Sequence, residues 1–248
     1  MLCVFTSDRT SWTLGGFFVQ LERHAPAVVA TDEIVVFGYS VPDNLPNYAG
    51  FISLGKFEDY PPHRWSDGFL KALGWLDRRG YTHFWFMLDD YWLIRGSDTA
   101  GIDLLGDYMA GHYREVMKID LAFDRLYNDP GRYAYYANHY GTVGHLDLIE
   151  SPPASNYQMS LWGGIFSVPL LLEFIHPGWT AQEVELSGTP ILAETGYKVL
   201  GTRQAPVLHT NVCHAGRYFQ FFPRLPEDDY GALHRNGFVP EEIHRATQ

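Results

Sequence analysis

Two adjacent aspartates, Asp89 and Asp90, stand at the end of an apolar run, FWFMLDDYWL (84–93). Neighbouring carboxylates repel and raise each other's pKa unless a cation neutralises them. Hard oxygen ligands suit Mg²⁺ or Mn²⁺, which proteins often hold with one or two carboxylates together with phosphate oxygens. The pair therefore predicts a site for a divalent metal and a diphosphate. The alternative is that the two acids cap the next element or face solvent.

The residues before the pair predict the elements that position it. Apolar residues at helical spacing predict a helix over about 65–79, and Gly80 predicts its end. A buried strand then leads to the acids, and ligands of open α/β sheets collect beyond the carboxyl ends of strands. Three further strands are predicted: one over 2–8, one that ends near Gly38 and one over 49–55. A helix is predicted over about 12–24. This alternation predicts an α/β fold with a mainly parallel sheet.

The second half of the chain has a different texture. It contains a candidate helix over 102–118, a Tyr-rich stretch (132–141), and a strand or turn that feeds a helix within 157–175. The remainder is polar and reads as loop-rich. We expect one domain over 1–248, with a donor-nucleotide half (about 1–97) and an attached acceptor half (about 98–248).

Composition narrows the class of protein. In 248 residues, 46% are hydrophobic, which is enough for a sizeable core, and 16% are aromatic. The net charge of −11 disfavours broad binding to nucleic acid or anionic membranes. Cys3 and Cys213 do not make a disulfide framework, and no signal peptide or membrane-spanning run is found, so we expect a soluble cytoplasmic protein. The absence of Gly-rich phosphate loops and of GxSxG disfavours kinases, dehydrogenases and α/β-hydrolases.

Three segments, in this order, resemble a family of small bacterial and phage-borne glycosyltransferases of the GT-A fold. They are VFTSDRTSW (4–12), LGWLDRRGYTHFWFMLDDYWLI (73–94) and YQMSLWGGIFSVPLLLEFIHPGWTAQEVE (157–185). The resemblance implies a GT-A-like, Rossmann-like fold and metal-dependent transfer of a sugar from a nucleotide-sugar, most commonly a UDP-sugar. Mn²⁺ or Mg²⁺, held by Asp90 and Asp89 in a DxD-type motif, then bridges to the diphosphate. WGGIFSVPL departs from the family's usual Gln-x-x-Ile-Trp pattern at the acceptor side.

The same resemblance implies residues for the donor. Thr6, Ser7 and Asp8 would hold the nucleoside, Arg9 would face the diphosphate, and Ser66 would contact the donor. Each has an ordinary structural alternative. Ser7 and Asp8 suit a helix N-cap, an N-cap is the default for Ser66 at the opening of the helix at 65–79, and Arg9 suits solvent.

Glu183 and Glu185, in WTAQEVE, are candidates for the general base. An inverting transferase needs a carboxylate to take the proton of the acceptor hydroxyl, and the resemblance implies one in this stretch. The alternative is a pair of surface charges.

His209 and His214 are candidates for a third metal ligand, because GT-A enzymes often draw one from a C-terminal histidine and imidazole can join carboxylates on Mn²⁺. Ordinary hydrogen-bonded loop histidines are the alternative. Cys213 lies between them, but no second cysteine lies nearby to complete a zinc spacing.

The acceptor is expected to be a hydroxyl of a surface glycan, with a hydroxymethylated DNA base as the alternative. For DNA, the Tyr-rich stretch would hold a flipped base and nearby cations would bind phosphates: Arg114, Lys118, Arg125 and Arg132. Trp162 and Trp179 could stack on a sugar or base, or pack in the core. A non-catalytic carbohydrate-binding module is the alternative from another class.

Overall fold

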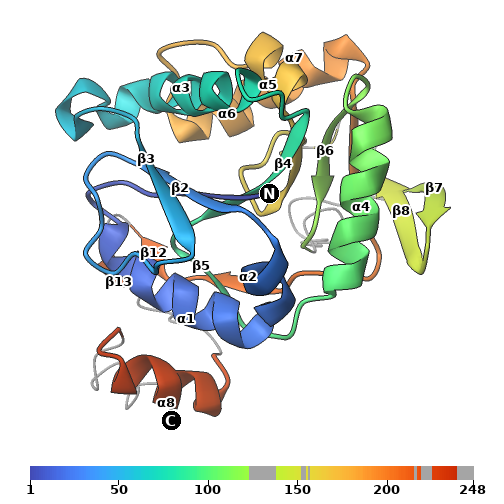
Figure 1. The fold of residues 1–248 in the computed structure, drawn as a ribbon. Coiled ribbons are helices and arrows are strands. Elements are labelled where there is room, and N and C mark those ends of the chain that lie inside the picture. Colours follow the sequence, from blue (N-terminus) through green and yellow to red (C-terminus); the bar gives the residue numbers. More distant parts are fainter. Residues whose placement is uncertain (123–137, 152–154, 156, 215–216, 219–224, 239–248) are drawn as a thin grey trace. The chain divides into compact units, whose positions relative to one another are not determined.

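The computed structural model describes residues 1–122, 138–151, 155, 157–214, 217–218 and 225–238 (Figure 1). The chain divides into two compact units, each assembled from separate stretches. The first unit comprises Met1–Gly55, Met87–Thr99 and Val207–Gln248, and the second comprises Lys56–Phe86 and Ala100–Pro206. This division differs from the predicted boundary near residue 97, because 56–86 belong to the second unit and 207–248 return to the first.

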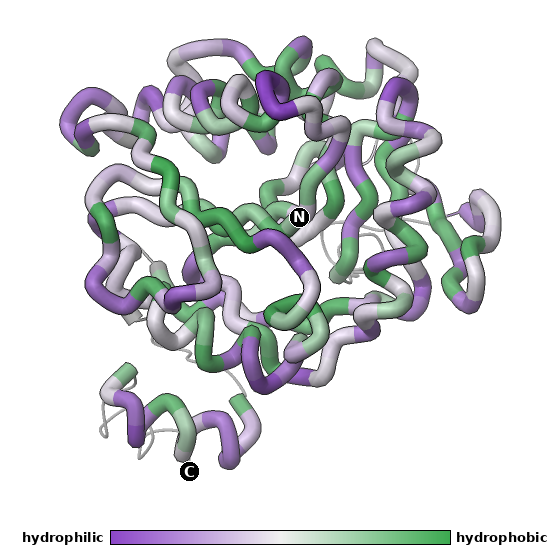
Figure 2. The backbone as a smooth tube through the Cα atoms, in the orientation of Figure 1, coloured by the Kyte–Doolittle hydropathy of each residue, from purple (hydrophilic) through white to green (hydrophobic). Residues whose placement is uncertain are grey.

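Parallel strands build the core of the first unit. β1 (Leu2–Phe5) pairs in parallel with β2 (Ile34–Gly38), and β2 pairs in parallel with β3 (Ala49–Ser53). Every residue of β1 and β2 is buried, and Figure 2 shows the hydrophobic colour along β2. Continuous apolar runs of this kind are typical of parallel strands covered on both faces. The predicted strands and their parallel pairing are confirmed here.

A two-stranded antiparallel sheet joins distant parts of the first unit. β5 (Tyr91–Leu93) follows the acidic pair directly and pairs with β11 (His209–Asn211). Gln20 of α1 (Leu14–His24) donates from Nε2 to the carbonyl of Leu93 at 2.9 Å. Short elements complete this unit: η1 (Ser11–Thr13), α2 (Pro26–Thr31), β12 (Cys213–His214) and β13 (Arg217–Tyr218).

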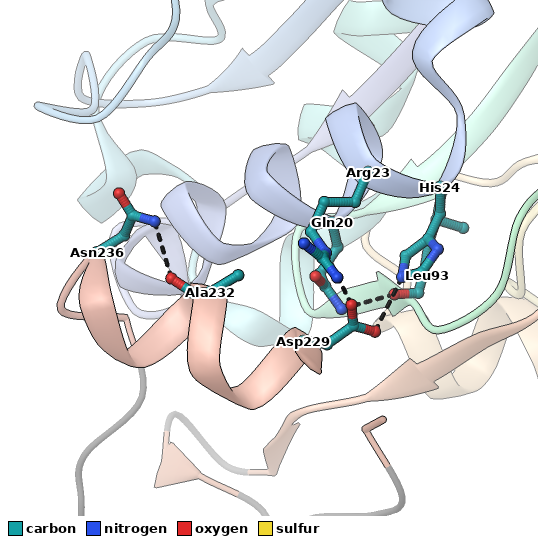
Figure 3. A network of polar contacts seen from close by, with 7 residues as sticks. All are labelled: Gln20, Arg23, His24, Leu93, Asp229, Ala232 and Asn236. Carbon is teal, nitrogen blue, oxygen red and sulfur yellow. Dashed lines mark hydrogen bonds and ion pairs between the residues drawn. The ribbon is translucent and has the colours of Figure 1, made fainter. Parts of the chain in front are cut away.

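Helix α8 (Glu227–Arg235) is fastened to α1 by a buried carboxylate (Figure 3). Asp229 is 1% exposed, accepts a hydrogen bond from Arg23 Nε at 2.8 Å, and lies 2.9 Å from His24 Nε2. The hydropathy colours alternate along α8 in Figure 2, as expected for an amphipathic helix that buries one face. This C-terminal helix was not predicted from the sequence.

The strands of the second unit form a mixed arrangement in the order β4-β9-β6-β10-β8-β7. β6 and β10 run parallel, and the other four neighbouring pairs are antiparallel. The α/β class is therefore confirmed, while the predicted parallel pairing holds for β1, β2 and β3 of the first unit. Their bounds are β4 (His83–Leu88, its last two residues in the first unit), β6 (Val116–Asp120), β7 (Asn138–Val143), β8 (Leu146–Glu150), β9 (Gly164–Ser167) and β10 (Lys198–Thr202).

Helix α3 (Trp65–Asp77) confirms the helix predicted before the acidic strand. Its apolar positions, such as Phe69 and Leu76, are buried, and Gly80 adopts a φ of +79° in the turn that follows. The remaining helices are η2 (Phe57–Asp59), η3 (Pro62–Arg64), α4 (Thr99–His112), α5 (Val168–Phe174), α6 (Ala181–Leu186) and α7 (Gly188–Thr195). None of the helices described is long and apolar enough to cross a membrane.

Lys118 corrects two predictions. The helix predicted over 102–118 ends as α4 at His112, and Lys118 lies within β6. The side chain is fully buried, forms an ion pair with Asp120, and donates to the carbonyl and hydroxyl of Ser160 at 2.8 and 2.7 Å. A buried ammonium needs such partners. Lys118 is thus unavailable for a DNA phosphate, and Arg125 and Arg132 lie outside the described residues.

Candidate functional site

Asp89 lies in the turn directly after β4 and is held from β1. Its backbone N–H donates to the carbonyl of Phe5 at 3.1 Å, and its Oδ2 accepts from the hydroxyl of Thr6 at 2.5 Å. The side chain is only 3% exposed. Gly38 leaves room for this contact, because a Cβ at that position would come within 2.6 Å of Thr6 Cγ2. The end of β2 thus permits the bond that joins the ends of β1 and β4.

Asp90 has a different environment. Its backbone carbonyl accepts from Val212 N–H at 2.9 Å, so the segment after β11 is anchored at the acidic pair. Its Oδ1 is buried and has no hydrogen-bond partner among the described residues. A buried carboxylate oxygen without a donor is costly unless the group is protonated or meets a cation.

The pKa of both carboxyls is raised. Burial is the main cause for Asp90, the charge of Asp89 adds to it, and the pKa reaches about 8. For Asp89, burial raises the pKa to about 6, and the hydroxyls of Thr6, Thr10 and Thr13 partly offset this. Asp90 therefore holds a proton near neutral pH when no cation is present, and a divalent cation would displace it.

This arrangement makes stability without metal depend on pH. Because the pKa of Asp90 is raised from 3.8 to about 8 on folding, the folded chain binds the extra proton in this window. The stabilisation that this bound proton gives the folded state is fully present below pH 3.8. It is lost as the pH rises through about 8. We expect Asp90→Asn to gain stability relative to the unsubstituted chain between about pH 5 and about pH 8. Urea unfolding of both proteins with a chelator measures this, and a difference that does not grow with pH would contradict it.

The residues fit a divalent cation held largely by its substrate. No group of three or more His, Cys, Asp or Glu side chains able to hold a metal occurs in the part of the chain that the structure describes. Mg²⁺ is commonly bound by one or two carboxylates plus substrate phosphates, so two adjacent aspartates suffice. With Asp89 Oδ2 engaged by Thr6, the free Oδ1 of Asp90 is the better direct ligand.

The other residues predicted to bind the nucleotide-sugar donor follow β1. Ser7 Oγ lies 3.0 Å from Thr10 Oγ1, and Arg9 is exposed. Asp8 accepts from the N–H and the hydroxyl of Ser40 at 3.1 and 2.9 Å. The helical segments that follow have no side-chain cap, so the N-cap alternative for Ser7 and Asp8 is wrong. Sequence reasoning missed Ser40, although its position just beyond β2 placed it at the same edge.

The two histidines predicted as metal ligands lie in two short strands. His209 is the first residue of β11, and His214 is the last residue of β12. His209 stacks on Tyr91, with ring centroids 4.7 Å apart and an interplanar angle of 10°. It does not belong to any metal-binding group of the described residues. The backbone of His214 pairs with Arg217 in β12–β13, and its side chain lies outside the description.

Ser66, in the second unit, is a structural residue. It is fully buried, its Oγ accepts from Trp179 N–H at 2.8 Å, and its own N–H donates to the Trp179 carbonyl at 2.9 Å. The N-cap of α3 is Arg64, so the prediction of a Ser66 cap is wrong. These bonds fasten the turn before α6 to the start of α3.

Glu183 and Glu185 also lie in the second unit, and their settings differ. Glu183 forms a capping box with Thr180: its side chain accepts from Thr180 N–H at 2.7 Å, and Thr180 Oγ1 accepts from Glu183 N–H at 3.0 Å. These bonds lower the pKa of the exposed Glu183. Glu185 is half-buried, and its Oε1 accepts from Leu161 N–H at 2.8 Å. Glu183 is thus engaged in capping its own helix, whereas Glu185 binds the backbone of Leu161.

The two tryptophans predicted as stacking faces also differ. Trp179 packs edge-on against Phe174, with ring centroids 6.4 Å apart. Trp162 is 42% exposed, directly after Leu161. The Tyr-rich stretch is described only from residue 138, where it forms β7.

Known protein families were compared with the chain and no family model matches it. A comparison with curated proteins likewise finds no match.

Proposed function

We propose that this protein is a metal-dependent glycosyltransferase with a GT-A-like fold, which moves a sugar from a nucleotide-sugar, by preference a UDP-sugar, to a hydroxyl of a surface glycan. The observation that carries the proposal is the acidic pair. Asp89 and Asp90 end a buried strand, and Asp90 Oδ1 is buried with no donor among the described residues. A chain that keeps two adjacent buried carboxyls at a strand end has reason to do so if a cation binds there.

In this proposal the first unit binds the donor. Asp90 holds Mn²⁺ or Mg²⁺, and Thr6 keeps Asp89 oriented beside it. A bound cation supplies Lewis-acid stabilisation of the negative charge that develops on a leaving diphosphate. Asp8, fixed by Ser40, offers a carboxylate to a ribose hydroxyl or a base N–H. Thr6, Ser7 and Asp8 follow β1, where ligands of α/β sheets commonly bind.

The two residues predicted as the general base, Glu183 and Glu185, both lie in the second unit. Of the two predicted bases, Glu185 is the better candidate, because the capping box occupies Glu183 and keeps its pKa low. A general base takes the proton of the attacking hydroxyl as the bond to the anomeric carbon forms, which gives an inverting reaction.

DNA is less favoured as the acceptor. One of its four proposed phosphate contacts, Lys118, is buried in an ion pair, and the overall charge is −11. A carbohydrate-binding module without catalysis would have no use for the buried acids of the first unit.

A thermal-shift screen tests the proposal. UDP-, GDP-, CMP- and ADP-sugars are each added with and without Mn²⁺. We expect a rise in melting temperature with one nucleotide only when the metal is present, because binding to the folded state alone stabilises it. No metal-dependent shift with any of the four would refute the donor and metal assignments.

A further inference from the structure

A small cavity of about 90 Å³ is lined by residues of the second unit alone. It opens between the end of β8, the start of β10 and α7, all labelled in Figure 1 except β10. At roughly 30 Å³ per water molecule, it accommodates about three waters or an equally small group of a larger ligand. It is therefore suited to the edge of a molecule rather than to a whole one.

Part of the lining of this cavity is polar. Ser151 is 3% exposed, and its Oγ is buried without a hydrogen-bond partner among the described residues. Gln158 adds a side-chain amide and is 4% exposed. Lys198 donates to Glu150 at 2.7 Å, so both signs of charge are present side by side. Buried polar groups that lack a partner are uncommon in folded proteins, and one that lines a cavity points to an occupant.

The charges decide the class of this occupant. A free anion would meet the carboxylate of Glu150, and a free cation would meet the ammonium of Lys198. A hydroxyl both donates and accepts, so it matches a wall that offers a hydroxyl, an amide, an ammonium and a carboxylate. The lining also contains Leu192 and Val199, whose apolar side chains suit the C–H surface of a ring.

The backbone next to the cavity adds an independent observation. Tyr157, directly before Gln158, has a φ of 53°, which is uncommon for a residue other than glycine. The residue is 37% exposed. Strained backbone of this kind is concentrated at binding and active sites, and tyrosine is a common stacking partner for sugar rings.

We propose that this cavity, lined by Ser151, Gln158 and the Glu150–Lys198 pair, binds the hydroxyl-bearing edge of a neutral sugar. The ligand class is an uncharged pyranoside. Binding in this cavity requires neither a metal nor a nucleotide, so it can be tested separately from the transfer reaction.

Saturation-transfer NMR with methyl glycosides tests this site. The probes are methyl β-D-galactopyranoside, methyl α-D-glucopyranoside and methyl α-D-mannopyranoside, with inorganic phosphate as the anionic competitor. We expect at least one glycoside to bind without Mn²⁺ and phosphate not to compete. Asp90→Asn should bind it as the unsubstituted protein does, which separates this result from the donor proposal.

Two variants locate the binding. Gln158→Leu keeps the approximate volume but removes the amide, and Ser151→Ala removes the hydroxyl. Each should weaken glycoside binding about threefold to tenfold, as expected for one lost hydrogen bond. Ser151→Ala should leave the melting temperature equal or higher, because it removes a buried hydroxyl that the empty protein leaves unpaired. Glu194→Gln, an exposed change on α7 outside the cavity, is the matched control.

Three results would overturn the proposal. The first is that no glycoside binds. The second is that phosphate binds in its place. The third is that Ser151→Ala and Gln158→Leu bind glycoside as well as Glu194→Gln does.

Discussion

Replacing Asp90 by Asn is expected to abolish Mn²⁺-dependent binding of UDP and to leave the protein at least as stable as before. The substitution removes one of two ligand charges, and metal affinity should fall by at least roughly a hundredfold, since even indirect partners of a metal commonly contribute ten- to a hundredfold. It also ends the repulsion between Asp89 and Asp90, which helps to raise the pKa of Asp90 to about 8. Isothermal titration of UDP with and without Mn²⁺ measures the effect.

A control variant distinguishes the loss of a metal ligand from the loss of one negative charge elsewhere in the unit. Asp43→Asn removes an exposed carboxylate of the first unit and should leave the affinity unchanged. Equal Mn²⁺-dependent affinity in Asp90→Asn and Asp43→Asn would remove Asp90 from the metal site.

Replacing Glu185 by Gln is expected to lower turnover by at least about a hundredfold with donor binding nearly unchanged, as for a lost general base. The amide oxygen of Gln can still accept from Leu161 N–H, so the local packing should persist. Glu183→Gln is the matched control. It should retain most activity, because Gln also serves in a capping box with Thr180. Release of UDP in the presence of a surface-glycan extract gives the rate.

The two variants together decide the assignment. A loss confined to Glu183→Gln would transfer the role to Glu183. Wild-type turnover in both would indicate a retaining reaction or another base.

Local patterns predicted the first unit's strands and helix α3 well, since each is an apolar run or a helical stripe bounded by turn residues. β6 was missed because Lys118 interrupts its apolar pattern. Its burial depends on Ser160, which is 42 residues away in the sequence, and on Asp120. No local window contains that information. Gly164 of WGGIF depends on the same lysine, because a Cβ at this position would lie 2.8 Å from Lys118 Cε.

The candidate site shows the same contrast. The position of Asp89 and Asp90 after a buried strand followed from the sequence, but the bond from Thr6 to Asp89 spans 83 positions and depends on strand order. Ser66 was interpreted as a cap or a donor contact because its partner, Trp179, is 113 residues away. By contrast, the capping box of Thr180 and Glu183 is visible in the sequence as T-A-Q-E, and it could have been recognised there.

The return of residues 207–248 to the first unit has a consequence for the order in which the chain can fold during its synthesis. The stretches that make the second unit have all been translated once Pro206 is added. The first unit must wait, because among the described residues β11 is the strand that pairs with β5 and Val212 N–H is the donor to the Asp90 carbonyl, and both follow residue 206. Since domains tend to fold as soon as their residues have left the ribosome, the amino-terminal strands should be the last to reach their final setting. A chain that ends at Pro206 and has been released from the ribosome should then contain a protease-resistant second unit, while its acidic pair lacks β11 and the Val212 donor.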